Sequence, residues 1–245
     1  MDFVALHQAL AATDNPSLPG LLTAQCALRG MWALVLMTLS VRLLRRRSRA
    51  VQAVAALVIG VWVLLPGSGS PAYWLGLAFM APSWTSVGLC IIFMYPQTHT
   101  MPVVPPTKTM ELGTLVMAVM GIALGWLLLA DMLLWLPLMD SVYAWGFSPW
   151  AVLIVSVMGI VPLLLWGMRL MPPDSGAISV LVLPVFALIA FVFTRLPSGN
   201  VWDALLDPWL WFLLHVFILQ KCVQFVRQRK KKPSHHEPTP SRSSV

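Results

Sequence analysis

Seven long stretches of apolar residues, almost free of charge, constrain most strongly how this chain can fold. A helix that crosses the hydrocarbon core of a bilayer needs roughly 20 mostly apolar residues. Only 10% of the 245 residues are charged and 58% are hydrophobic, whereas a soluble domain carries roughly 25% charged residues. The sequence therefore predicts an all-α fold, a polytopic transmembrane helical bundle of about seven spans. The spans are expected at about 24–44, 50–65, 71–94, 111–135, 149–168, 176–194 and 208–226.

The apolar stretches also predict how the chain is divided. We expect residues 1–20 to form a periplasmic segment, 21–226 the transmembrane domain, and 227–245 a basic, disordered cytoplasmic tail rich in Pro and Ser. The second span, 50–65, is the shortest, at about 24 Å of helix. It crosses the bilayer only if the lipid thins locally or if Arg49 reaches to the surface along its side chain.

The distribution of Lys and Arg predicts the direction of the spans. Ten of the sixteen lie in two runs, Arg42–Arg49 and Arg227–Lys232. Loops rich in Lys and Arg stay in the cytoplasm, and six spans separate the two runs, so both can lie there. Fourteen positive residues then lie inside, and two, Arg29 and Arg195, lie outside. The N-terminus is therefore expected outside the cytoplasm and the C-terminus inside.

Three spans that enter from the outer side begin with a capping residue followed by proline. These pairs are Ser70-Pro71, Ser148-Pro149 and Asp207-Pro208. Proline is favoured at the first position of a helix, and a Ser or Asp before it accepts a hydrogen bond from a free amide. The sequence therefore predicts helices that begin at these prolines.

Most of the twelve Trp residues fall near the expected outer ends of the spans. Trp rings anchor at the level of the lipid headgroups, so we interpret them as an aromatic belt; a ligand-binding stripe is the alternative. The residues concerned are Trp62, Trp74, Trp135, Trp145, Trp150, Trp202, Trp209 and Trp211.

The fourth span carries a row of small residues at helical spacing: Thr114, Ala118, Gly121 and Gly125. Small side chains let two helices approach closely in a membrane, where the hydrophobic effect does not drive helix association. We expect this row to pack against another helix of the same chain, and self-association or docking to a partner is the alternative.

Prolines lie inside three spans, at Pro82, Pro162 and Pro184. Each removes a backbone hydrogen bond and is expected to kink its helix. Beside the first, Ser83, Thr85 and Ser86 can satisfy the freed backbone groups. Broken helices line many ion and substrate sites, but a packing kink is the more frequent role.

Ionisable groups within the bilayer are pointers to function, and two stand out. Asp131 lies near the outer end of the fourth span, and His215 lies two turns into the seventh. A single His supplies neither the two axial ligands of a haem b nor the ligand set of a metal site, and the three cysteines have no metal-binding spacing. No cofactor or metal is therefore expected. The two groups form a possible intramembrane polar site, with a His held between helices as the alternative.

The basic runs directly follow apolar spans, where anionic headgroups lie. Membrane lipids with anionic headgroups are therefore the expected partners, together with other integral membrane proteins, and nucleic acid is not. The residues expected to contact anionic lipid are Arg45, Arg46, Arg47, Lys230, Lys231 and Lys232.

These features favour a non-enzymatic accessory, scaffold or assembly subunit of a membrane complex in a bacterial inner membrane. A small-solute or proton-coupled transporter that uses Asp131 and His215 is the alternative. An enzyme is not indicated, because no loop gathers a nucleophile, a base and oxyanion donors.

Overall fold

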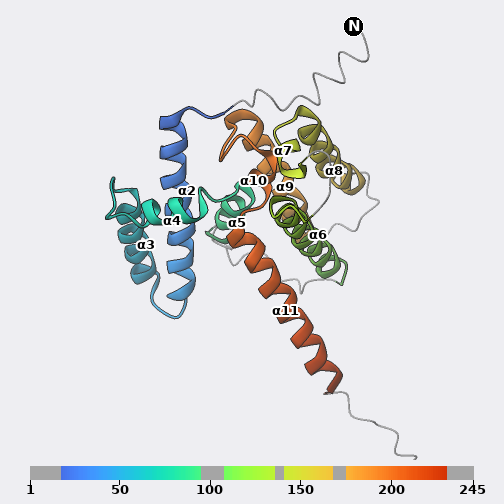
Figure 1. Ribbon diagram of the computed structural model, residues 1–245. Coiled ribbons are helices and arrows are strands. Elements are labelled where there is room, and N and C mark those ends of the chain that lie inside the picture. The colour runs from blue at the N-terminus through green and yellow to red at the C-terminus, as the bar shows by residue number, and fades with distance from the viewer. Residues whose placement is uncertain (1–17, 95–107, 136–140, 168–174, 231–245) are drawn as a thin grey trace, which may run out of the picture.

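The computed structural model describes residues 18–94, 108–135, 141–167 and 175–230, and every regular element in them is an α-helix (Figure 1). The helices are α2 (Leu21–Leu43), α3 (Arg49–Leu64), α4 (Pro71–Phe79), α5 (Trp84–Met94), α6 (Lys108–Met132), α7 (Val142–Trp145), α8 (Pro149–Gly167), α9 (Ser175–Thr194), α10 (Val201–Leu205) and α11 (Pro208–Lys230).

Three helices are long and apolar enough to cross a membrane: α2, the Gly113–Met132 part of α6, and the Pro208–Arg227 part of α11. Shorter apolar helices accompany them at Arg49–Leu64, Trp84–Met94, Pro149–Ile160 and Val182–Thr194. The chain is thus an all-helical membrane protein.

Helices α2 and α3 lie side by side, and α4 crosses them (Figure 1). The crossing is close because Gly76 has no side chain: a Cβ there would lie 2.9 Å from the Leu28 Cδ1 atom. Helix α5 then follows only the second half of α2. Near its start, Trp84 and Val87 pack with Met31, in the middle of α2. Near its end, Phe93 lies beside Arg42, whose guanidinium is 4.3 Å from the centre of the ring.

The expected span 71–94 is not one continuous helix. It is interrupted between α4 and α5, where Met80 has a φ of 60°. Pro82 cannot donate a backbone hydrogen bond and its ring crowds the preceding turn, so the helix ends ahead of it. The Trp32 indole N–H donates to the Met80 carbonyl at 2.8 Å, which satisfies a group that the interruption leaves open.

The other two prolines do not interrupt their helices. Helix α8 runs through Pro162, and α9 runs through Pro184. A lost hydrogen bond is therefore tolerated at these two positions, and only Pro82 lies where the chain changes direction.

All three predicted proline starts are confirmed. Helix α4 begins at Pro71 with the Ser70 hydroxyl accepting from the Ala72 amide at 3.2 Å. Helix α8 begins at Pro149, and the Ser148 hydroxyl accepts from the Ala151 amide. Helix α11 begins at Pro208, after Asp207. Local capping chemistry is thus enough to place these ends.

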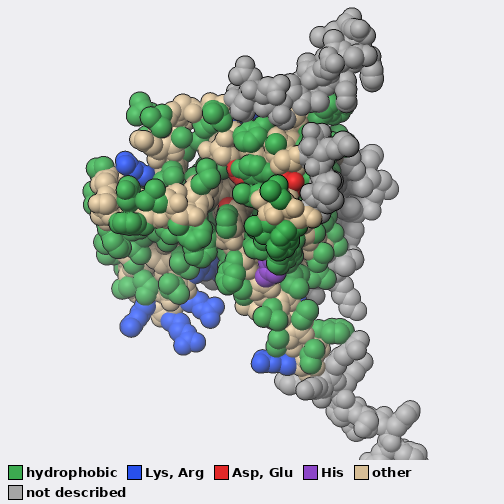
Figure 2. Space-filling model, in the orientation of Figure 1, with side chains coloured by type: hydrophobic (Ala, Val, Ile, Leu, Met, Phe, Trp, Pro, Cys, Tyr) green, Lys and Arg blue, Asp and Glu red, His purple; other side chains and the backbone are tan. Residues whose placement is uncertain are grey.

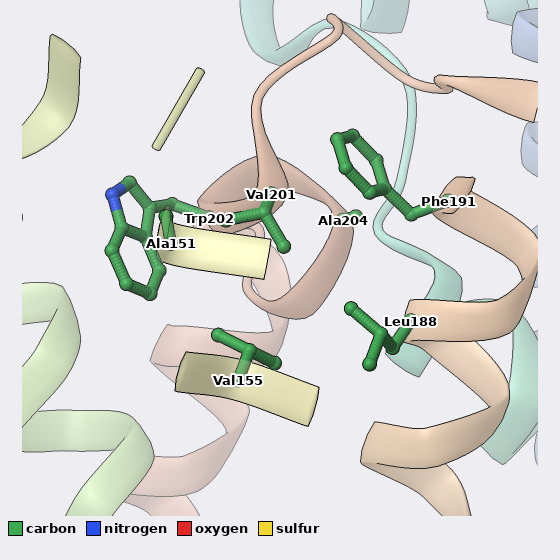
Figure 3. Packing of buried hydrophobic residues seen from close by; sticks show 7 residues of the cluster. All are labelled: Ala151, Val155, Leu188, Phe191, Val201, Trp202 and Ala204. Carbon is green, nitrogen blue, oxygen red and sulfur yellow. The ribbon is translucent and has the colours of Figure 1, made fainter. Parts of the chain in front are cut away.

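The main buried cluster joins α8, α9 and α10 (Figure 3). Phe191 of α9 is fully buried and faces Val201 and Ala204 of the short helix α10, which are also buried. Helix α10 was not expected from the sequence, because five residues carry too little pattern to show a helix. It fills the space between the longer helices at this end of the molecule.

Two boundaries differ from the expected ones. Helix α11 continues through Lys230, so residues 227–230 are helical and not part of a disordered tail. The segment between the expected spans 111–135 and 149–168 contains the one-turn helix α7. The remaining tail and the first 17 residues lie outside the described part of the chain.

Candidate functional site: buried carboxylates and the α6–α11 contact

Asp207 is the most heavily hydrogen-bonded carboxylate in the described residues, and it is only 6% exposed. Its Oδ2 atom accepts from the Ser83 amide at 2.8 Å, the Ser83 hydroxyl at 2.7 Å and the Ser86 hydroxyl at 2.6 Å. Its Oδ1 atom accepts from the Leu210 amide at 2.7 Å. One side chain therefore joins the start of α11 to the start of α5.

Two helix N-termini meet at this carboxylate. The free amides at a helix start carry a partial positive charge that favours an anion, and α5 and α11 both direct such amides at Asp207. The sequence indicated Asp207 only as a cap for α11. Its second role could not be predicted, because nothing in the sequence brings residue 207 to residues 83 and 86.

The residues expected to satisfy the break at Pro82 behave differently from one another. The Ser83 hydroxyl does satisfy a backbone group, because it accepts from the Ser86 amide at 3.1 Å. The Ser86 hydroxyl does not, because it donates to the Asp207 carboxylate instead. Thr85 does not, because its hydroxyl is buried without a hydrogen-bond partner in the described structure.

Asp131 lies at the end of α6, where it is 7% exposed. Its carboxylate accepts from the Ser141 hydroxyl at 2.7 Å and from the Tyr143 amide at 2.9 Å. Ser141 is itself the N-cap of α7. Asp131 therefore ties the one-turn helix α7 to the end of α6, and it occupies the start of that helix as an anion would be expected to.

His215 lies in the contact between α6 and α11. The Trp126 indole N–H donates to its Nε2 atom at 3.3 Å, and its Nδ1 atom lies 2.8 Å from the Trp211 carbonyl oxygen. An indole N–H can only donate, so Nε2 accepts and the ring proton is on Nδ1. The Trp211 and His215 rings pack edge to face, 4.8 Å apart.

Asp131 and His215 do not share partners. Asp131 is bonded to the segment that leads into α7, whereas His215 is bonded to Trp126 and Trp211. Along α6, Asp131 lies five residues beyond Trp126, about 7 Å further along the axis. Within the described residues, no hydrogen bond joins the two groups of the expected polar site.

The row of small residues on α6 faces α11 at its two glycines. A Cβ on Gly125 would lie 2.3 Å from Cδ1 of Trp211, and one on Gly121 would lie 2.7 Å from Cδ1 of Leu214. The Trp211 indole N–H also donates to the Ile122 carbonyl at 3.2 Å. Earlier in the row, Ala118 is buried and Thr114 is half-buried. The glycines thus make room for a tryptophan against the backbone of α6.

A second group of polar side chains joins α7 to the segment that contains α10. The Tyr143 hydroxyl donates to Asp203 Oδ2 at 2.8 Å, and the Ser198 hydroxyl donates to the same oxygen. Asn200 is fully buried, and its amide nitrogen donates to the Tyr143 carbonyl at 2.8 Å. Gly146 is required here, because a Cβ would lie 2.0 Å from Asn200 Oδ1. We call Tyr143, Ser198, Asn200 and Asp203 the α7–α10 polar cluster.

Burial raises the pKa of two groups in the α7–α10 polar cluster. Loss of water raises the pKa of the Asp203 carboxyl, and hydrogen bonds from Ser198 and Tyr143 oppose this only in part. Burial, followed by the charge of Asp203, raises the pKa of the Tyr143 hydroxyl. Burial therefore moves the titration of both groups to higher pH.

The expected aromatic belt divides into two kinds of Trp. Trp62, Trp74 and Trp135 are well exposed, as rings at a headgroup layer would be. Trp202 is instead buried in the main cluster, and Trp211 fills the α6–α11 contact. Position near a helix end did not distinguish the two kinds, because both kinds of Trp lie near the ends of helices.

The arginines of the expected lipid contact lie in the turn between α2 and α3, where Arg45, Arg46 and Arg47 are exposed. Figure 2 shows Lys and Arg side chains gathered at the lower end of the α2–α3 pair, with others further along α11. Lys230 ends α11, and Lys231 and Lys232 lie outside the described residues.

Among the described residues, no three His, Cys, Asp or Glu side chains form a group that could hold a metal ion. Comparison of the chain with models of protein families, with characterised proteins and with solved structures found no match.

Proposed function

We propose that this chain is a non-enzymatic accessory, scaffold or assembly subunit of a membrane complex in a bacterial inner membrane. The observation that carries this proposal is how its polar groups are used. The carboxylates of Asp131, Asp203 and Asp207 and the ring of His215 each hold helix ends or helix pairs together. Groups whose hydrogen bonds are used in this way stabilise the arrangement of the helices, and they are poorly placed to bind or transform a substrate.

The proposal includes a seven-span topology with the N-terminus outside and the C-terminus inside. The strong bias of Lys and Arg supports it, as do the three confirmed helix starts. The interrupted helix at Pro82 would then count as one crossing made of α4 and α5.

Photo-crosslinking in native membranes tests the proposal. A benzophenone amino acid in place of Val119 of α6, which is 52% exposed, or Phe212 of α11, which is 59% exposed, should give a discrete adduct with a second membrane protein. The matched control replaces Phe191, which is fully buried, and should give no such adduct. Adducts with lipid alone, from a protein that purifies as a lone monomer, would contradict a subunit role.

A transporter is the second candidate, and one observation favours it. The interruption at Met80–Ser83 lies beside a buried carboxylate, as in broken-helix ion and substrate sites. If the relay of Asp131 and His215 exists, Asp131→Asn and His215→Ala should each abolish a transport or growth phenotype while the protein still accumulates in the membrane. An unchanged phenotype in both variants would eliminate the relay.

A further inference from the structure

The turn between α2 and α3 concentrates positive charge without any carboxylate to balance it. Its five arginines, which are Arg42, Arg45, Arg46, Arg47 and Arg49, are all exposed. No ion pair joins them to an acidic side chain anywhere in the described residues, and the sequence has no Asp or Glu between Asp14 and Glu111.

The backbone of this turn is closed without help from the arginine side chains. The Arg47 amide donates to the Leu44 carbonyl at 2.8 Å. The Gln52 side-chain amide donates to the Leu44 and Arg47 carbonyls, at 3.3 and 2.9 Å, and the Ser48 hydroxyl caps α3. The turn is therefore held in one shape. The Arg42 guanidinium packs on the Phe93 ring, whereas those of Arg45, Arg46 and Arg47 are left for a ligand outside the protein.

A shallow, open apolar depression on one face of α3, which we call the α3 groove, begins directly beside the arginines. It has a volume of about 490 Å³ and runs along α3, and its lining is almost wholly apolar. From Ala50 to Ile59 it covers about 14 Å of helix. A row of guanidinium groups next to such a groove matches a molecule with a phosphate at one end and a hydrocarbon chain attached. The lining residues are Ala50, Val51, Val54, Ala55, Val58 and Ile59.

We propose that the α2–α3 turn and the α3 groove form a binding site for one anionic phospholipid. The guanidinium groups of Arg45, Arg46 and Arg47 bind the headgroup phosphate, which matches the paired donors of arginine, and an acyl chain lies along the groove. Gln52 is a positioning residue that holds the turn. This site is independent of the proposed subunit role.

Lipid binding to the purified full-length chain, counted by native mass spectrometry, tests the site. Phosphatidylglycerol should bind more tightly than phosphatidylcholine. Replacing the three arginines with Gln should weaken phosphatidylglycerol binding about a hundredfold, at about fivefold for each charge near the surface, and leave phosphatidylcholine binding unchanged. Replacing them with Lys keeps the charge but not the paired donors, so the loss should be about tenfold.

Matched variants separate the two halves of the site. Ala55→Trp fills the groove and should weaken phosphatidylglycerol binding, whereas Leu57→Trp, just outside the lining, should not. Arg29→Gln removes a positive charge elsewhere and should also have no effect. Equal weakening by Arg29→Gln and the triple Gln variant would overturn the site, as would equal binding of the two lipids. Displacement of the lipid by millimolar inorganic phosphate would show a site for a free anion and would overturn the lipid assignment.

The thermal midpoint of unfolding is the control for correct folding, and it should be unchanged in the exposed arginine variants. Gln52→Leu supplies a further test, because it keeps every charge but removes the donors that hold the turn. It should weaken phosphatidylglycerol binding several-fold with little change in the binding of phosphatidylcholine. Full binding by this variant would contradict the preorganised turn.

Discussion

Asp207 shows how one carboxylate can determine the arrangement of segments that lie far apart in the sequence. Its two oxygens accept four hydrogen bonds, from donors at the start of α5 and at the start of α11. Hydrogen bonds to a charged acceptor are about twice as strong as neutral ones. Without this carboxylate, the Ser83 and Leu210 amides and the Ser86 hydroxyl would lose their acceptor.

Replacing this carboxylate is therefore expected to destabilise the protein strongly. Asp207→Asn keeps the size of the side chain but places N–H groups against donors, and it should lower the free energy of unfolding by about 2–4 kcal/mol. Denaturant titration in detergent measures the change. Ser86→Ala removes a single donor and should lower it by only about 1 kcal/mol; similar losses in the two variants would contradict the central role of Asp207.

The α7–α10 polar cluster should make the stability of the protein depend on pH. Because the pKa of Asp203 is raised by burial, the folded protein binds more protons than the unfolded one above the ordinary value of about 4. The free energy of unfolding should thus fall as the pH rises through the raised pKa of the folded state, and then stay level. Thermal midpoints of the wild type and Asp203→Asn, compared across this range, measure the contribution. A difference between them that does not change with pH would contradict it.

The pairing of α6 with α11 shows how a contact between two helices depends on the absence of a side chain at one position. Gly125 leaves room for the Trp211 ring, which then donates to the backbone of α6. The sequence predicted a contact face from the spacing of small residues. It could not predict the partner helix, because many helices carry an aromatic ring that could fill the same space.

A single methyl group should disturb this pairing. In Gly125→Ala the new Cβ would lie 2.3 Å from the Trp211 ring, so the helices must separate, and the free energy of unfolding should fall by about 2–3 kcal/mol. Gly113→Ala is the matched control on the same helix. Nothing lies within 4 Å of its Cβ position, so it should be neutral or stabilise by up to about 1 kcal/mol. Equal effects of the two changes, measured by denaturant titration, would show that the contact is not tight.

The three prolines show why a sequence pattern does not by itself place a break. All three remove a backbone hydrogen bond, yet α8 and α9 continue through theirs. At Pro82, the Trp32 indole and the Asp207 carboxylate supply partners for the groups that an interruption frees. The break therefore depends on neighbours from α2 and from the segment before α11.

For the whole molecule, the asymmetry of charge supports the proposed orientation in the membrane. The exposed arginines lie at one end of the α2–α3 pair, and the 65–70 segment lies at the other end of α3. If α3 crosses the bilayer as proposed, these two places lie on opposite sides, even though α3 has only 16 residues.

Cysteine labelling measures this orientation. In a variant without Cys26, Cys90 and Cys222, Ser68→Cys should react with a membrane-impermeant maleimide in intact cells. Arg46→Cys should react only after the cells are opened. Labelling of both positions from the same side would show that α3 does not cross, and the seven-span topology would then be wrong.

Composition and local chemistry alone determined that the chain is helical, that it belongs in a membrane, and where several helices begin. These properties follow from apolar length and from capping residues next to proline, which act within a few neighbours. Tertiary structure alone decided that Asp207 joins α5 to α11, that Trp211 fills the space at Gly125, and that Pro82 is the one proline of the three that marks a break. Each of these depends on groups separated by 48 or more residues, and only packing in space brings such groups within hydrogen-bonding distance.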